Sequence, residues 1–258
     1  MALRRVFDAL IMLAVAAGAA ACSGGSAGSG GSRAAGASAS DVISAPCIKA
    51  GTAQARQIVH FANSAGTPVE AYVSSPAAGK QVSSSGTVGI VIVHQSLQTL
   101  CETMSWAVVF SDAGYLALAP SVEANQQVAD VDASVAYLRA HGAKQVVLLG
   151  GSMGGTAVLQ AAAGLAPPVQ AVVSLSGPSV YAPMNALVTA PKLAVPVFYS
   201  AGAQDTEFAA DETALYKATV EQDRTLDIVP NEALHGFALL RGPGLLSKIE
   251  AFLGAHLR

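Results

Sequence analysis

A serine set among glycines is the residue best suited to chemistry in this chain. Ser152 stands in Gly150-Gly151-Ser152-Met153-Gly154-Gly155, after an apolar run and before a helical segment. A serine hydroxyl is a weak nucleophile, so it needs a tight, exposed turn beside a base, which flanking glycines permit. The backbone N–H of Met153, at the start of the helix, could donate to a developing oxyanion. The pattern predicts a nucleophilic serine; the alternative is a glycine-rich turn whose serine only caps the helix.

Such a serine requires an acid and then a histidine base, each placed after a later strand. Asp205 follows the predicted strand Val195–Ser200, and we assign it as the acid, because its rivals Glu207 and Asp211 lie nearer the next helix. His235 follows the last predicted strand, and we assign it as the base. The other histidines lie before the serine, at a helix end or in the tail: His60, His94, His141 and His256.

The oxyanion of an ester transition state needs a second donor besides Met153. We expect it in the loop after the predicted strand Val88–His94, where the sequence continues Gln95-Ser96-Leu97-Gln98. By position the backbone N–H of Ser96 is the better candidate, and that of Gln95 is the alternative. The candidate site therefore combines Ser152, Asp205 and His235 with these donors.

Alternating strands and helices would hold these residues in place. Strands are predicted at Gln54–Ala62, Val69–Ser74, Val88–His94, Tyr115–Ala119, Gln145–Leu149, Gln170–Leu175, Val195–Ser200 and Arg224–Val229. Helices are predicted at Glu102–Ala113, Asn125–His141, Ala209–Glu221 and Gly244–Leu257, with another that begins at about Ser152. Strands joined through helices form right-handed crossovers. The pattern predicts one α/β domain with a mainly parallel sheet of about eight strands, helices on both faces and the opening hairpin at an antiparallel edge.

Composition excludes several classes of function. The 258 residues are 52% hydrophobic and 12% charged, with a net charge of −3, which excludes disorder along the whole chain. Lys and Arg never cluster beyond two in a row, so we expect no nucleic-acid partner. The sequence contains no metal-ligand cluster, dinucleotide fingerprint or phosphate-loop lysine, so we expect no metal and no cofactor.

The N-terminus has the features of an export signal. Arg4 and Arg5 precede the apolar run Ala9–Ala21, which is too short for a spanning helix and ends in small residues before Cys22. Residues 1–21 are therefore predicted to be a signal peptide. The arrangement resembles a bacterial lipoprotein signal, although Ala19 stands where leucine is usual. This resemblance implies that Cys22 is acylated and anchors the protein to a membrane of the cell envelope.

The alternative is ordinary cleavage, which leaves Cys22 as a free thiol on a secreted or periplasmic protein. Residues 22–46, rich in Ser, Gly and Ala, are predicted to form a flexible tether, and residues 47–258 the domain. If Cys22 carries lipid, Cys47 and Cys101 are an even pair that could form a disulfide after export. The alternative is two independent thiols.

The ordered motifs of the chain resemble the α/β-hydrolase superfamily, in its dienelactone hydrolase-like and esterase branch, from about Ala53 to Leu257. The resemblance rests on VIVHQS at 91–96, AGYLALAP at 113–120, AYLRAHGA at 136–143, GGSMGG at 150–155, AGAQD at 201–205 and LHGF at 234–237. It implies the α/β-hydrolase fold. Many relatives have His-Gly where this chain has His94-Gln95, and dienelactone hydrolases use cysteine where Ser152 stands. The connection at 176–194 is short, which indicates a small or absent lid.

These features predict an exported serine hydrolase that acts on a small-molecule carboxylic ester through an acyl-enzyme. One alternative is an inactive, surface-tethered binding module on the same fold, which would normally have lost a triad residue. Another is hydrolysis of a thioester, an amide or a carbon–carbon bond on the same fold.

Overall fold

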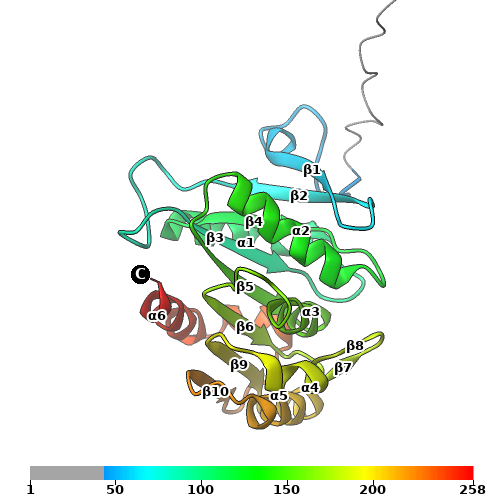
Figure 1. Ribbon diagram of the computed structural model, residues 1–258, viewed down its shortest axis with the longest axis vertical. Helices are drawn as coiled ribbons and strands as arrows, with labels where there is room; N and C mark the ends of the chain where they lie inside the picture. The colour runs from blue at the N-terminus through cyan, green and yellow to red at the C-terminus, as the bar shows by residue number, and fades with distance from the viewer. Residues whose placement is uncertain (1–43, 258) are drawn as a thin grey trace, which may run out of the picture. The chain divides into compact units, whose positions relative to one another are not determined.

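An eight-stranded sheet is the centre of the fold (Figure 1). The computed structural model describes residues 44–257, so the predictions for the signal peptide, for Cys22 and for most of the tether lie outside the described residues. The strands run in the order β1-β2-β4-β3-β5-β6-β9-β10. Their bounds are β1 Ile58–Ala62, β2 Pro68–Ser74, β3 Val88–Val93, β4 Leu116–Pro120, β5 Gln145–Gly151, β6 Ala171–Leu175, β9 Val197–Gly202 and β10 Arg224–Val229.

The strand directions agree with the predicted topology. β1 pairs with β2, and β2 with β4, in antiparallel register, whereas every pair from β4 to β10 is parallel. The opening hairpin is therefore at the antiparallel edge. The prediction of a mainly parallel α/β-hydrolase sheet of about eight strands is confirmed.

Helices cover both faces of the sheet, as Figure 1 shows. Their bounds are α1 Leu100–Ala113, α2 Gln127–Ala140, α3 Met153–Ala162, α5 Thr206–Ala218 and α6 Leu245–His256. Strand β3 is buried throughout and contributes side chains to both faces. Val91 and Val93 pack in the core that includes α2, α3 and α5. Ile90 and Ile92 pack in the core that includes α1 and α6. Alternate side chains of a strand point to opposite faces, so a strand buried on both sides is apolar throughout.

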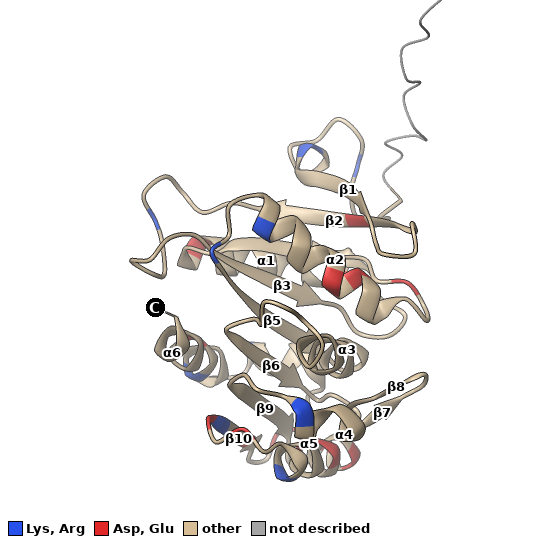
Figure 2. Cartoon of the chain, viewed as in Figure 1, with Lys and Arg blue, Asp and Glu red and all other residues tan. Residues whose placement is uncertain are grey.

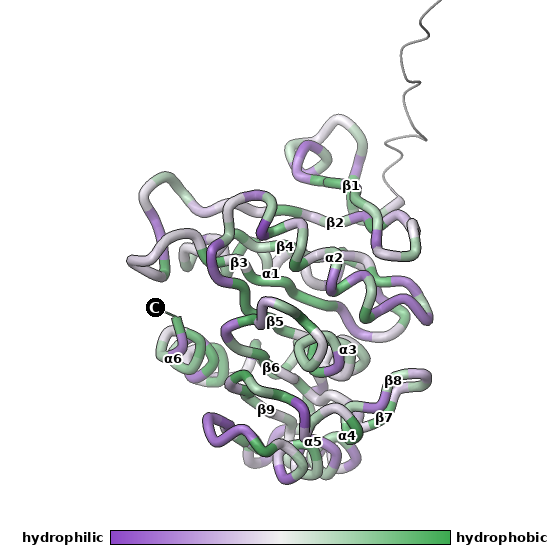
Figure 3. Tube along the Cα trace, in the orientation of Figure 1, coloured by the Kyte–Doolittle hydropathy of each residue, from purple (hydrophilic) through white to green (hydrophobic). Residues whose placement is uncertain are grey.

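Hydropathy and charge follow the same division. The central strands β3, β5 and β6 carry no charged residue (Figure 2) and are largely hydrophobic along their length (Figure 3). No helix within residues 44–257 combines the length and apolar character needed to cross a bilayer.

Three predicted boundaries were wrong for local reasons. Residues Gln54–Gln57 form a 3₁₀ turn instead of the start of a strand, because the hydroxyl of Thr52 accepts the N–H of Ala55 and the chain coils. Helix α1 begins at Leu100, before the predicted Glu102, because the Thr99 side chain caps it. Helix α5 begins at Thr206, directly after Asp205, rather than at residue 209.

The ordered domain also begins earlier than the predicted residue 47. Ala45 is buried, and the backbone N–H groups of Ser44 and Ala45 both donate to the carboxylate of Glu70 on β2, at 2.7 and 2.9 Å. Residues 44–46 are therefore part of the domain and not of a flexible tether.

The connection between β6 and β9 is small, as predicted. It contains the two-stranded hairpin β7 (Val180–Tyr181) and β8 (Met184–Asn185), then α4 (Ala186–Thr189) and a 3₁₀ turn at Ala190–Lys192. This segment follows the carboxyl end of β6, next to the strand that leads to Ser152.

Candidate active site

Ser152 occupies a strained turn between strand β5 and helix α3. Its backbone has φ +50° and ψ −122°, a region that residues other than glycine rarely adopt. The turn is held on both sides: the Ser152 N–H donates to the carbonyl of Leu175 at 2.8 Å, and its own carbonyl accepts from Gly155 at 2.8 Å. Strain that the surroundings enforce is characteristic of functional sites. The local geometry is that expected for an exposed nucleophile.

The glycines of the motif are required by close backbone contacts. A Cβ on Gly150 would lie 2.2 Å from the carbonyl oxygen of Gly154, and a Cβ on Gly154 would lie 2.3 Å from that of Val93. Helix α3 therefore approaches strands β5 and β3 more closely than any side chain permits. This approach directs the helix N-terminus toward the end of the sheet.

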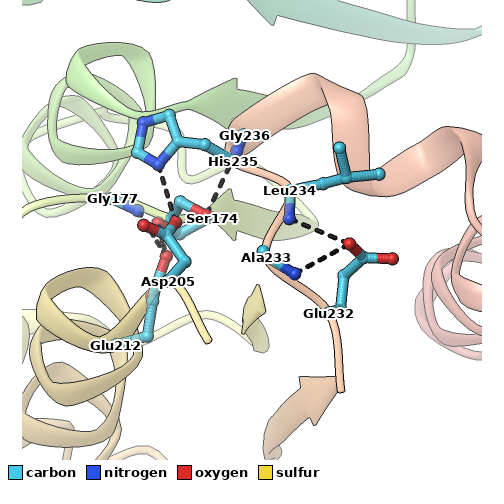
Figure 4. A network of polar contacts seen from close by, with 10 residues as sticks. Ser174, Gly177, Asp205, Glu212, Glu232, Ala233, Leu234, His235 and Gly236 are labelled. Atoms are coloured by element: carbon cyan, nitrogen blue, oxygen red, sulfur yellow. Dashed lines mark hydrogen bonds and ion pairs between the residues drawn. The ribbon is translucent and has the colours of Figure 1, made fainter. Parts of the chain in front are cut away.

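Asp205 and His235 form a direct hydrogen bond. Asp205 Oδ2 lies 2.7 Å from His235 Nδ1, and the second ring nitrogen points away from the carboxylate (Figure 4). The two side chains are 15% and 33% exposed, so the pair is largely sheltered but reachable. The ring also packs edge-on against Phe208, with centroids 4.3 Å apart. An acid on Nδ1 leaves Nε2 available to accept a proton.

The loops that carry the pair are themselves joined. The N–H of Gln204 donates to the carbonyl of Glu232 at 2.8 Å, and the Glu232 carboxylate accepts the N–H groups of Ala233 and Leu234 (Figure 4). These bonds shape the turn that leads from β10 to His235. The structure therefore fixes the acid loop and the base loop relative to each other.

The same loops contact the serine turn. A Cβ on Gly151 would lie 2.8 Å from the ring of Phe237 and 3.3 Å from Cγ of Gln95, so the three segments pack together. The N–H of Gly236 donates to Ser176 Oγ, which follows β6, at 3.1 Å. The segments that carry the predicted nucleophile, base and oxyanion donor thus pack together at the carboxyl ends of the parallel strands.

The rival acids are placed differently. Glu207 is exposed on α5, and Asp211 Oδ1 accepts the hydroxyl of Ser179 at 2.6 Å. Of the three carboxylates considered from the sequence, Asp205 is the one bonded to His235.

The oxyanion loop is held by a carboxylate that sequence reasoning missed. Glu102 Oε2 accepts the N–H of Gln95 at 2.8 Å, and Glu102 also accepts the side-chain amide of Gln95. The N–H of Gln95 is therefore occupied, whereas that of Ser96 has no acceptor within residues 44–257. Met153 is the first residue of α3, where an N–H lacks a partner in the helix. This geometry favours Ser96 and Met153 over Gln95 as donors.

His94 fixes the other side of this loop. Its Nδ1 donates to the carbonyl of Gln95 at 2.7 Å, because its Nε2 accepts the N–H of Val122 at 2.9 Å and so carries no proton. Burial lowers the pKa of His94, which keeps the ring neutral. His94 is thus a structural link between β3 and the segment after β4.

A second buried carboxyl lies behind the acid loop (Figure 4). Glu212 Oε1 accepts the hydroxyl of Ser174 at 2.7 Å and the N–H of Gly177 at 2.6 Å. Burial raises the pKa of Glu212 to about 8. No periodic signal in the sequence distinguished this residue from other helix carboxylates.

Cys47 and Cys101 are joined in the structure by a disulfide, with Cα atoms 5.7 Å apart. The bond attaches the start of the domain to the first turn of α1, next to Glu102. Residues 44–257 contain no group of three or more His, Cys, Asp or Glu side chains arranged to hold a metal ion.

Comparisons with known proteins agree with this fold. The model of the dienelactone hydrolase family matches residues 121–248. No curated protein sequence matches the chain. An esterase of Pyrococcus furiosus superposes with a TM-score of 0.65 at 14% identity, covering 85% of this chain and 100% of that one.

Two further structures are similar. A dienelactone hydrolase of Anabaena variabilis has a TM-score of 0.59 at 21% identity, covering 78% of this chain and 100% of that one. A putative dienelactone hydrolase of Klebsiella pneumoniae has a TM-score of 0.60 at 19% identity, covering 76% and 98%. The chain therefore has the α/β-hydrolase fold, and the match of residues 121–248 to the dienelactone hydrolase family supports a hydrolase of the esterase type.

Proposed function

We propose that the protein is an exported serine hydrolase that cleaves small-molecule carboxylic esters through an acyl-enzyme formed on Ser152. The observation that carries this proposal is the 2.7 Å bond between Asp205 and His235, on loops that pack against the strained turn of Ser152. The three residues also follow in the order Ser, Asp, His that this fold uses.

The proposed mechanism uses the serine, histidine and aspartate in the roles that such a triad has. Asp205 accepts a hydrogen bond from the Nδ1–H of His235, which keeps the proton on Nδ1 and leaves Nε2 as the base. His235 takes the proton of Ser152 as Oγ attacks the ester carbonyl. The N–H groups of Ser96 and Met153 donate to the oxyanion, which collapses and expels the alcohol with the proton held by His235. Water, activated by the same histidine, then attacks the acyl-enzyme and regenerates Ser152.

The fold and the similar structures favour one class of substrate. Similar structures include esterases and dienelactone hydrolases, which favours esters over amides. The segment between β6 and β9 is short, which favours an open entrance that admits esters of different shapes.

Active-site labelling tests the proposal. The wild type should react with a fluorophosphonate probe and hydrolyse p-nitrophenyl esters, and Ser152→Ala should do neither. Ser247→Ala, on the exposed face of α6, is the matched control and should behave as wild type. Labelling or turnover that survives in Ser152→Ala would reject the assignment. A wild type that neither labels nor turns over would favour the inactive binding module, and a preference for thioester or anilide substrates would favour the other hydrolases.

Export and lipid anchoring at Cys22 are part of the proposal. The disulfide between Cys47 and Cys101 supports export, because disulfides persist in oxidising compartments. In a bacterial host, the full chain should incorporate an alkyne-tagged fatty acid and sediment with membranes. Cys22→Ser should lose both properties while it keeps esterase activity. A Cys22→Ser protein that still carries the label would place the lipid elsewhere.

A further inference from the structure

The oxyanion loop has a hydrogen bond to the small hairpin after β6. Ser96 Oγ and Tyr181 Oη lie 2.7 Å apart, although the residues are 85 positions apart in the chain. Ser96 follows β3 and Tyr181 follows β6, and these two strands flank β5, which ends at Ser152. The bond therefore bridges across the carboxyl end of the strand that presents the nucleophile.

Both ends of the oxyanion loop are held by hydrogen bonds, and Ser96 lies between them. At Gln95 the loop is fixed by Glu102, by His94 and by a turn bond from the N–H of Gln98. At the other end the buried Leu100 begins α1, and its N–H donates to Ser121 Oγ at 3.0 Å. Between the two ends, the side chain of Leu97 is 99% exposed and its backbone has φ +61°. Among the described residues, the side chain of Ser96 has one hydrogen bond, and its partner is Tyr181. That hydroxyl is thus the one side-chain contact, within residues 44–257, that can orient the Ser96 hydroxyl.

Tyr181 comes from a well-anchored hairpin. The segment before it is fixed by the Ser179 hydroxyl, which donates to Asp211, and by the Thr156 hydroxyl, which donates to the carbonyl of Pro178. After the turn, the N–H of Asn185 donates to the side chain of Gln160 on α3 at 3.0 Å. The ring of Tyr181 is partly buried and packs against the hydrophobic core that includes residues of α3. Such an anchored side chain can fix the position of the residue to which it is hydrogen-bonded.

We propose that Tyr181 is a positioning residue of the oxyanion hole. Its hydroxyl holds Ser96 so that the backbone N–H of Ser96 faces the carbonyl oxygen of an ester bound at Ser152. This inference rests on the proposed function, because it gives a role to a donor of that reaction. It also gives the short segment between β6 and β9 a part in catalysis beyond covering the entrance.

The proposal predicts a specific kinetic pattern. Removal of an oxyanion donor typically costs about 10²–10³ in kcat. Tyr181→Phe keeps the ring and leaves the donor present but poorly aimed, so we expect a smaller loss of about 5- to 50-fold in kcat with little change in KM. Ser96→Ala breaks the same bond and should cost a similar factor. Since both act through one contact, the double variant should be no worse than either single one.

The experiment compares these three variants with wild type on p-nitrophenyl esters and with Tyr137→Phe, which removes a tyrosine hydroxyl on α2 away from the site. Affinity for phenylboronic acid, which forms a tetrahedral adduct on a nucleophilic serine, should fall by the same factor as kcat in Tyr181→Phe, and thermal melting should change little. A purely structural hydroxyl would lower the melting temperature and leave kcat and boronate affinity unchanged.

The outcomes separate this inference from the proposed function. If the wild type turns over, Ser152→Ala does not, and Tyr181→Phe retains full kcat, the positioning role is overturned and the proposed function stands. Losses that multiply in the double variant would overturn the shared contact. If Ser152→Ala keeps activity, or the wild type hydrolyses no ester, the proposed function fails and this inference fails with it.

Discussion

The carboxylate of Glu102 accepts the backbone N–H of Gln95 at 2.8 Å and also binds its side-chain amide. Glu102, on helix α1, thus occupies the backbone N–H of Gln95, the alternative oxyanion donor. The backbone N–H of Ser96 remains without an acceptor within residues 44–257. The first turn of α1 therefore holds the loop of the candidate oxyanion donors through Glu102. The disulfide between Cys101 and Cys47 attaches this turn covalently to the start of the domain.

Glu102→Ala should therefore lower kcat by about 10-fold or more, toward the 10²–10³ expected when an oxyanion donor is lost. The physical reason is that the loop after β3 loses its two bonds to α1. Steady-state kinetics on p-nitrophenyl esters measure the effect, with Glu123→Ala, an exposed carboxylate after β4, as the control. An unchanged kcat in a folded Glu102→Ala protein would show that the loop keeps its shape without this residue.

The disulfide should stabilise the domain. It closes a loop across 54 positions, and restricting the unfolded chain over such a length contributes on the order of 4 kcal/mol, although measured values are often smaller. Cys47→Ser with Cys101→Ser should lower the urea midpoint to the value that wild type shows in reductant. Thiol titration of the denatured, unreduced protein should detect neither cysteine, and two free thiols there would contradict the bond.

Asp205→Asn should leave the fold intact and reduce kcat by about 10⁴-fold. The amide no longer holds the His235 ring with its proton on Nδ1, nor does it stabilise the charged ring during reaction. Circular dichroism checks the fold and steady-state assays check the rate, with Glu207→Gln as the matched control. A rate near that of wild type would transfer the role to another carboxylate.

The sequence predicted the parts of the site that depend on strand ends. Ser152, Asp205 and His235 each follow a parallel strand, and parallel strands bring their carboxyl ends to one edge, so position along the chain was sufficient. The supporting contacts have no such local rule. Thr99 and Glu102 match a helix capping box, yet the Glu102 carboxylate turns to Gln95, because the loop after β3 passes beside it.

The contact of Tyr181 is even harder to predict from the sequence. Its partner Ser96 is 85 positions away, in a different loop, and the two meet only because β3 and β6 are neighbours of β5. The 3₁₀ turn at Gln54–Gln57 was missed because a single hydroxyl, that of Thr52, directs it. Contacts decided by one side chain or by strand order are not encoded in a periodic pattern.

Burial raises the pKa of the Glu212 carboxyl to about 8 from its ordinary 4.5. Between these values the folded protein holds a proton that the unfolded chain has released, so the free energy of unfolding should fall as pH rises. Asp132, whose pKa burial raises to about 6, acts in the same direction but only in the lower part of this range. His94, whose pKa is lowered from 6.5, acts in the opposite direction and only below that pH.

The window from about pH 6.5 to 8 should therefore report mainly on Glu212. Wild type should lose stability across it, as measured by urea unfolding at several pH values, and Glu212→Gln should show a much flatter profile. The amide keeps an oxygen for Ser174 and Gly177 and cannot ionise, so the change isolates the proton. Asp132→Asn is the control and should retain the wild-type slope in this window. A Glu212→Gln protein with that same slope would mean that the loss of stability comes from another group.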